Sequence, residues 1–241
     1  MDFALILAIG LVAGTLSGIV GFGASIMLMP VLVIVFGPLQ AVPLMAIAAI
    51  MANLSRIIVW WREVDWRACA AYSVTAAPFA ALGAATLLVL PARIIEAALG
   101  VFFLSMIGVR RWMALHDLKL RRTHLAMIGV PVGYLTGIVV STCPLTAPIF
   151  VAAGLVKGAF ISTEAAASFI VYLAKAAVFR GFGALPMEIV VKGMIVGSTL
   201  MAGAFIAKRF VLHLQPNMFR LLMDGIMLVA GLALLWSALT S

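Results

Sequence analysis

The positions of the charged residues divide this chain into long apolar runs. Between Asp2 and Arg56 there are 53 residues without a charge, and another 25 separate Arg67 from Arg93. A helix that crosses the roughly 30 Å apolar core of a bilayer needs about 20 apolar residues. Runs of this length therefore predict several membrane-spanning helices rather than the core of a soluble domain.

Charges, prolines and glycines subdivide these runs into ten apolar elements. A long polar stretch, residues 110–122, lies near the middle of the chain and leaves five elements on each side. We therefore expect an all-α polytopic membrane protein with eight to ten crossings, built from a first repeat (1–110), a linker (111–123) and a second repeat (124–241). The expected elements are 3–20, 24–37, 40–61, 67–89, 92–110, 124–140, 144–156, 159–180, 187–207 and 217–239.

The two halves resemble each other in sequence. Residues 14–19 (Gly-Thr-Leu-Ser-Gly-Ile) match residues 133–138 (Gly-Tyr-Leu-Thr-Gly-Ile) at an offset of 119. The common order of several such matches indicates an internal duplication. If all five elements of the first half cross the membrane, the chain ends that half on the side opposite to its start. The second half then begins on that opposite side, which predicts inverted repeats of the kind found in secondary transporters. Further matches are Pro30 with Pro148, Arg62 with Arg180, Pro91 with Pro216, and Gly100 with Gly225.

The composition supports a membrane protein and excludes other classes. Hydrophobic residues make up 66% of the chain and charged residues 10%, whereas about a quarter of an average soluble domain is charged. The net charge of +8 comes from basic residues in short connectors, a pattern typical of cytoplasmic loops rather than of nucleic-acid binding. This bias predicts an inner-membrane protein with its N-terminus outside and its central linker in the cytoplasm.

Metal, disulfide and signal-peptide patterns are missing from the sequence. Cys69 and Cys143 both lie in apolar stretches, and no CxxC or HExxH spacing occurs. We therefore expect no disulfide framework, metal site or cofactor. The start, Met1-Asp2-Phe3, has no basic n-region, so we interpret it as the beginning of the first spanning helix.

The second element of each half is short and follows a stretch that disfavours a continuous helix. Residues 24–37 come after a glycine-rich segment, and residues 144–156 come after Ser141-Thr142-Cys143-Pro144. Non-helical backbone survives at membrane depth only when it is buried in protein or lines a cavity. Interrupted segments at matching places in two halves are typical of a transporter's binding site.

The residue types at these breaks suit an anion. N–H groups at a helix N-terminus attract negative ligands, hydroxyls donate hydrogen bonds, and glycine lets an oxyanion approach the backbone. The alternative is that the small residues simply let helices pack closely. The candidate substrate-binding residues at the breaks are Ser17, Gly18, Gly21, Phe22, Gly23, Ala24 and Ser25 in the first half, and Thr136, Gly137, Ser141, Thr142, Cys143 and Thr146 in the second.

The first break resembles a known family motif. Gly14-x-x-Ser17-Gly18-x-x-Gly21-x-Gly23 followed by Pro30, together with Trp61-Arg62-x-x-x-Asp65-Trp66, is similar to the pattern of the TauE/SafE sulfite exporter family. The resemblance covers both repeats and implies a secondary transporter of sulfite, sulfonates or related small anions. In the second repeat, Val140-Ser141-Thr142-Cys143-Pro144 stands where a glycine-rich run is expected, which leaves the substrate open.

Two cations lie inside apolar elements, Arg56 and Lys175, again at an offset of 119. Intramembrane cations are costly and often functional, so both are candidate substrate-binding residues. The alternative is that each side chain snorkels to the interface. Asn53 and Tyr172 lie one turn deeper and complete the candidate site, although either could instead bind a neighbouring helix.

The carboxylates have simpler explanations. Glu164 could be a proton-coupling group, but the sequence favours a role at a helix N-terminus after Ser162-Thr163. Local ion pairs account for the others, namely Arg220 with Asp224, Glu188 with Lys192, and Glu96 with Arg93.

Together these observations predict a secondary membrane transporter of exporter type that moves a small anion by alternating access. A coupling proton or sodium ion and the oligomeric state are left open, and nucleic acid is not an expected partner. An anion channel or uniporter and a carboxylate permease on the same fold are the alternatives. An enzyme is disfavoured because Cys143 has no histidine at comparable depth.

Overall fold

The computed structural model describes residues 3–20, 24–115, 119–139, 142–210 and 216–240. Every regular element in these ranges is helical. The helices are α1 (Phe3–Val20), α2 (Ala24–Phe36), α3 (Pro38–Trp60), the short 3-10 helix η1 (Trp61–Glu63), α4 (Trp66–Val89), α5 (Ala92–Leu115), α6 (Arg122–Ile138), α7 (Cys143–Ala152), α8 (Lys157–Gly181), α9 (Met187–Phe210) and α10 (Pro216–Thr240).

Each expected apolar element corresponds to one α-helix, which confirms the all-α class. Helix ends follow the local chemistry. Pro38 starts α3 directly after Gly37, whose φ of 73° suits glycine. The Asp65 side chain caps α4 by accepting hydrogen bonds from the backbone N–H groups of Arg67 and Ala68. One boundary differs, because α5 continues to Leu115 through the first residues of the expected linker.

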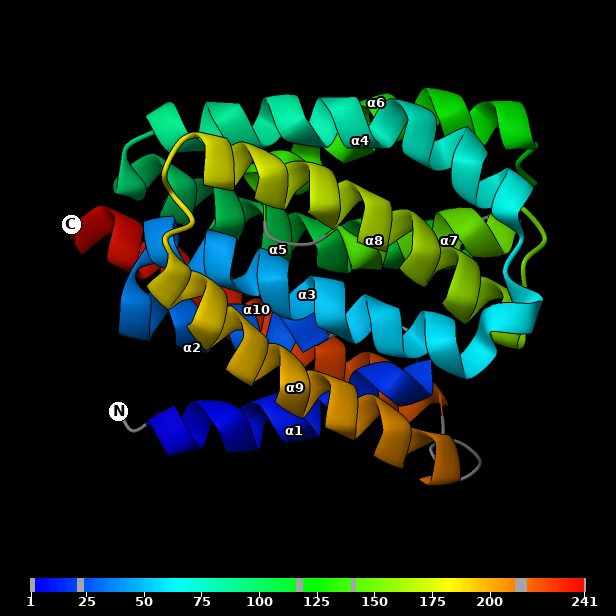
Figure 1. The fold of residues 1–241 in the computed structure, drawn as a ribbon, viewed down its shortest axis with the longest axis horizontal. Helices are drawn as coiled ribbons and strands as arrows, with labels where there is room; N and C mark the ends of the chain where they lie inside the picture. Colours follow the sequence, from blue (N-terminus) through cyan, green and yellow to red (C-terminus); the bar gives the residue numbers. More distant parts are fainter. Residues whose placement is uncertain (1–2, 21–23, 116–118, 140–141, 211–215, 241) are drawn as a thin grey trace.

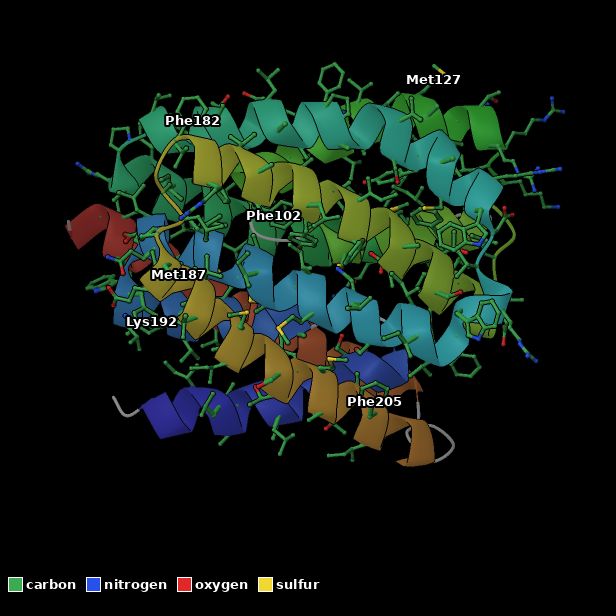
Figure 2. The ribbon with its side chains drawn as sticks, in the orientation of Figure 1. Phe102, Met127, Phe182, Met187, Lys192 and Phe205 are labelled. Atoms are coloured by element: carbon green, nitrogen blue, oxygen red, sulfur yellow. The ribbon has the colours of Figure 1, made fainter. Side chains whose placement is uncertain are left out.

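The helices run side by side along the long axis of the molecule, and both chain ends lie at the same end of the bundle (Figure 1). Within the described residues, α3, α4, α5, α8 and α9 are long and apolar enough to cross a membrane. Met127, Phe182 and Phe205 point outward and are exposed, whereas Phe102 lies inside (Figure 2). An apolar exterior of this kind is what contact with lipid requires.

The helix contacts follow the expected division into two halves. If each of the first five helices is replaced by its counterpart in the second half (α1 by α6, α3 by α8, α4 by α9, and the reverse), the main helix pairs stay the same. Helix α1 packs on α9 as α6 packs on α4, and α3 packs on α9 as α8 packs on α4. The remaining main pairs, α3 with α8 and α5 with α10, join equivalent helices. Two related halves would give this pattern, and the inverted repeat itself stays a prediction.

Glycines of the matched motifs lie where helix backbones touch. A Cβ on Gly14 would lie 2.7 Å from Cα of Leu200 in α9, and a Cβ on Gly133 would lie 2.7 Å from Cα of Ala76 in α4. A Cβ on Gly137, a predicted binding residue, would lie 2.6 Å from the backbone nitrogen of Ala84. These glycines are therefore needed for close helix packing.

Helices α6 and α7 form a re-entrant pair. The Leu120 N–H, just before α6, donates to the Ala152 carbonyl at the end of α7 (2.8 Å), so α7 ends on the side of the bundle where α6 begins. Ten residues of helix are about 15 Å long, about half of the apolar core of a bilayer. The N-terminus of α7 therefore lies deep in the bundle.

Candidate functional site

The break between α6 and α7 is stabilised by a buried lysine. Lys175, on α8, is fully buried, and its Nζ donates to the carbonyls of Thr136 (2.7 Å) and Val139 (3.0 Å). Carbonyls in the last turn of a helix have no partner within that helix. Lys175 supplies this partner for α6, so its position follows from the break and not from snorkelling.

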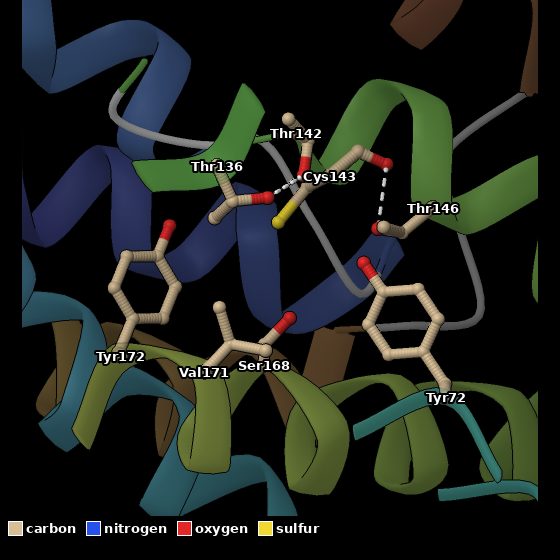
Figure 3. A pocket seen from close by; sticks show the side chains of 8 residues that line it. All are labelled: Tyr72, Thr136, Thr142, Cys143, Thr146, Ser168, Val171 and Tyr172. Atoms are coloured by element: carbon tan, nitrogen blue, oxygen red, sulfur yellow. Dashed lines mark hydrogen bonds between the residues drawn. The ribbon is translucent and has the colours of Figure 1, made fainter. Parts of the chain in front are cut away.

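A small polar cavity lies beside this break (Figure 3). The hydroxyls of Thr136 and Thr142 face each other 2.5 Å apart at its edge. The space open to the centre of a water molecule is ≈ 10 Å³, about what one water needs. The lining residues come from α4, α6, the start of α7, and α8, and are Tyr72, Thr136, Thr142, Cys143, Thr146, Ser168, Val171 and Tyr172.

The Glu164 carboxylate lies directly behind this lining. Its Oε1 accepts hydrogen bonds from Ser168 Oγ (2.8 Å) and Thr146 Oγ1 (3.2 Å), and Cys143 Sγ lies 3.5 Å away. Glu164 has no exposed surface and lies about two turns inside α8, which begins at Lys157. The expected role at a helix N-terminus is therefore wrong, because α8 begins too early for Glu164 to fall in its first turn.

Arg56 connects the first half of the chain to Glu164. Its Nη1 lies 3.5 Å from Glu164 Oε2, its Nη2 donates to Asn53 Oδ1, and its Nε donates to the Ala52 carbonyl (3.4 Å). Arg56 is 6% exposed, so it does not snorkel to the interface. Asn53 orients the guanidinium from the preceding turn of α3.

Buried basic groups outnumber the buried carboxylate around the cavity. Lys175 lies behind Thr136, and Arg56 lies behind Glu164, which gives two basic side chains against one acidic side chain. A buried charge is costly unless it is paired. These two basic side chains could therefore help to offset the charge of a negative ligand in the cavity.

Backbone N–H groups contribute less at this break than the sequence suggested. The N–H groups of Leu145 and Thr146 both donate to the Thr142 carbonyl, at 2.8 and 2.9 Å, and Pro144 has no N–H. The donors that face the cavity are therefore mainly hydroxyl groups.

The structure brings part of the predicted site together. Thr136, Thr142, Cys143, Thr146 and Tyr172 line the cavity, and Asn53, Arg56 and Lys175 lie behind it through the contacts above. Among the described side chains, Ser17, Ala24, Ser25 and Gly137 do not line this cavity, and the packing of Gly18 lies outside the described set. Gly21, Phe22, Gly23 and Ser141 lie outside the described residues.

Sequence analysis missed Tyr72, Ser168 and Val171 as lining residues, and Glu164 as their neighbour. A signal for two of them was present, because Glu164, Ser168, Tyr172 and Lys175 recur at the spacing of one helical face. Tyr72 comes from α4, and no local pattern places it near α8.

The other expected ion pairs had mixed outcomes. Glu188 and Lys192 are paired at 2.5 Å, as expected. The Glu96–Arg93 pair is wrong, because Arg93 donates to the Ala238 carbonyl (2.7 Å), and Glu96 Oε2 is buried with no hydrogen-bond partner in the part of the chain that the structure describes. Asp224 pairs with Arg111 of α5 (3.2 Å), and the side chain of Arg220 lies outside the described set.

A separate polar contact joins α4, α6 and α8 at one end of the bundle. Asp65 binds Arg122 at 3.2 Å, and its N–H donates to Thr163 Oγ1 (2.8 Å). Partial burial raises the pKa of Asp65, but the hydrogen bond from the Ala68 N–H and the charge of Arg122 outweigh burial and leave the pKa below its ordinary value. The ionised carboxylate therefore stabilises this contact.

An apolar helical bundle with a buried polar cavity at a helix break defines a polytopic membrane protein of the transporter class. Residues 6–234 match the family described as sulfite exporter TauE/SafE, and the chain belongs to that family. Membership indicates membrane transport of sulfite or related anions. No curated protein and no solved structure matches the chain.

Proposed function

We propose that the protein is a secondary transporter that carries sulfite, a sulfonate or a related small anion through the cavity at the α6–α7 break. The observation that carries the proposal is the combination of a hydroxyl-rich lining with an excess of buried basic groups. Hydroxyls can replace the hydration shell of an oxyanion, and the basic side chains offset its charge.

The cavity supports an alternating-access mechanism rather than an open pore. With room for about one water, it is too small for a sulfite ion, so the helices around it must separate before an anion enters. The symmetric pairing of α1 with α9 and of α4 with α6 would form two helix groups, each with helices from both halves, that rock against each other. Export is the expected direction.

The membrane arrangement is part of the proposal. We place the protein in the inner membrane with the N-terminus outside and the linker (111–123) in the cytoplasm, since basic residues favour that side. A single cysteine at Ala114, in a chain lacking Cys69 and Cys143, should react with an impermeant maleimide only after the membrane is opened. Labelling in intact cells would reverse the orientation.

Counterflow in proteoliposomes tests the transport function. Vesicles are loaded with unlabelled sulfite, methanesulfonate or acetate, and entry of the labelled anion is measured. A carrier accelerates entry when the same anion is present inside, whereas a channel shows no such acceleration. We expect acceleration for sulfite or methanesulfonate. Entry no faster than in protein-free vesicles for all three anions would contradict the proposal, and a preference for acetate would favour the carboxylate permease.

A further inference from the structure

Glu164 and a bound anion would need the same donors. The hydroxyls of Ser168 and Thr146 both line the cavity and both donate to Glu164 Oε1. A hydroxyl has one proton to donate, so it cannot serve the carboxylate and a substrate oxygen at once. An anion in the cavity therefore competes with ionised Glu164 for these two donors.

The two negative groups would also share one guanidinium. Arg56 Nη1 faces Glu164 Oε2 at 3.5 Å, which is longer than the usual charge-assisted hydrogen bond of about 2.8 Å. An anion in the cavity would lie one side chain away from the Glu164 carboxylate. Two negative charges at that distance in a buried site repel strongly, and protonation of the carboxylate removes this repulsion.

We infer that Glu164 is a proton-binding residue that couples anion movement to proton movement, one proton for each anion, in the transporter proposed above. The proton adds to a Glu164 oxygen from the side on which the cavity opens. The Arg56–Glu164 ion pair is then lost, and Arg56, Ser168 and Thr146 turn to the anion. For a monovalent anion the added positive and negative charges cancel, so the loaded site keeps its net charge.

The groups around Glu164 favour a proton over a sodium ion. Tyrosine and cysteine side chains are ordinarily neutral near pH 7, so the nearest fixed charge is the Arg56 guanidinium, and a metal cation beside it would be repelled. The surrounding titratable and charged groups are Arg56 from α3, Glu63 from η1 beside Gly158, Asp65 and Tyr72 from α4, Cys143 from α7, and Lys175 from α8.

The test measures proton movement together with anion movement. Wild-type protein in vesicles that contain a pH-sensitive dye is given methanesulfonate or sulfite, and we expect one proton to enter with each methanesulfonate ion. A pH gradient should drive accumulation of the anion. Net uptake of methanesulfonate without accompanying protons, or accumulation driven by a sodium gradient instead, would overturn the inference and leave the transport function standing. Absence of counterflow for every anion would contradict the transport function itself.

Two variants connect the effect to Glu164. In the wild type, one coupled proton changes the apparent affinity for methanesulfonate by at most about tenfold per pH unit. Glu164→Gln mimics the protonated residue, so the affinity of this variant should not depend on pH. Glu188→Gln removes a carboxylate whose side chain is 74% exposed, and it should keep that dependence. A Glu164→Gln protein that retained pH-driven accumulation would refute the assignment.

A milder change gives an independent readout. Ser168→Ala removes the closest donor to ionised Glu164, so protonation becomes easier and the pH midpoint of the anion affinity should move upward by roughly one unit. A general packing defect would lower activity without moving this midpoint. An unmoved midpoint in folded Ser168→Ala protein would contradict the role of Glu164 even if Glu164→Gln does not fold.

Discussion

The variant Gly133→Ala tests whether the motif glycines serve helix packing or anion binding. Atoms in ordinary contact with a Cβ lie at least 3.4 Å away, but a Cβ on Gly133 would lie 2.7 Å from Cα of Ala76 and 2.9 Å from its carbonyl carbon. Because both are backbone atoms and the carbonyl oxygen of Ala76 is closer still, α6 must move away from α4 by at least about 0.7 Å. Overpacking of this kind costs about 1–3 kcal/mol.

The matched control is Gly108→Ala in α5, where no described atom lies within 4 Å of the added Cβ. Alanine is favoured over glycine inside a helix by about 1 kcal/mol, so this variant should be as stable as the wild type or more stable. The two variants should therefore differ by about 2 kcal/mol, or roughly 4–8 °C in unfolding temperature for a chain of this length.

Thermal unfolding of the purified protein in detergent, followed by loss of the monodisperse peak, measures this difference. We expect a lower unfolding temperature for Gly133→Ala alone. Equal stability of the two variants, combined with lost transport in Gly133→Ala, would refute the packing role and indicate that Gly133 contacts the substrate.

Three further predictions follow from buried or bonded charges. Arg56→Gln should weaken anion affinity at least tenfold in counterflow, about 1.4 kcal/mol, whereas exposed Arg67→Gln should not, and equal affinities would contradict the role of Arg56. Lys175→Met should destabilise the protein by about 2 kcal/mol, since two carbonyls of α6 lose their donor while the cost of burying a cation is relieved. Exposed Lys119→Met should unfold like the wild type, and a similar loss there would count against the explanation. Asp65→Ala should cost about 1 kcal/mol at neutral pH through the lost cap. Because the pKa of Asp65 is lowered in the folded protein, its stabilisation is present above the ordinary value of 3.8 and disappears as the pH falls through the lowered value. A deficit that persists in strong acid would contradict this account.

The apolar pattern predicted the helices well because charged residues, proline and glycine mark most of the ends of membrane helices. Helices α3 and α4 begin at Pro38 and Trp66, within two residues of the expected starts at 40 and 67. The α6–α7 break was also predictable, since Pro144 and the hydroxyl residues before it disfavour a continuous helix. What the pattern did not reveal is that α7 returns to the side where α6 begins, which depends on the distant contact between Leu120 and Ala152.

The chemistry of the site was predicted less completely, because related backbones need not carry equivalent side chains. Arg56 and Lys175 occupy matching positions, yet Arg56 pairs with a carboxylate and Lys175 caps a helix end. The residue at the position of Glu164 in the first half, by the same offset of 119, is Met45. A site argued from symmetry therefore missed Glu164, and the role expected for the first break stays a prediction.

The tyrosines provide the most direct test that anions pass through the cavity. The chain contains three, of which Tyr72 and Tyr172 line the cavity and Tyr134 lies on α6 with its hydroxyl 3.4 Å from Thr86 Oγ1. Each Tyr→Phe change removes one hydroxyl and preserves the ring. Sulfite counterflow measured for the three variants should show about tenfold weaker apparent affinity for Tyr72→Phe and Tyr172→Phe, and wild-type affinity for Tyr134→Phe. Equal affinities in all three variants would contradict the account, because the anion would then not pass these two hydroxyls.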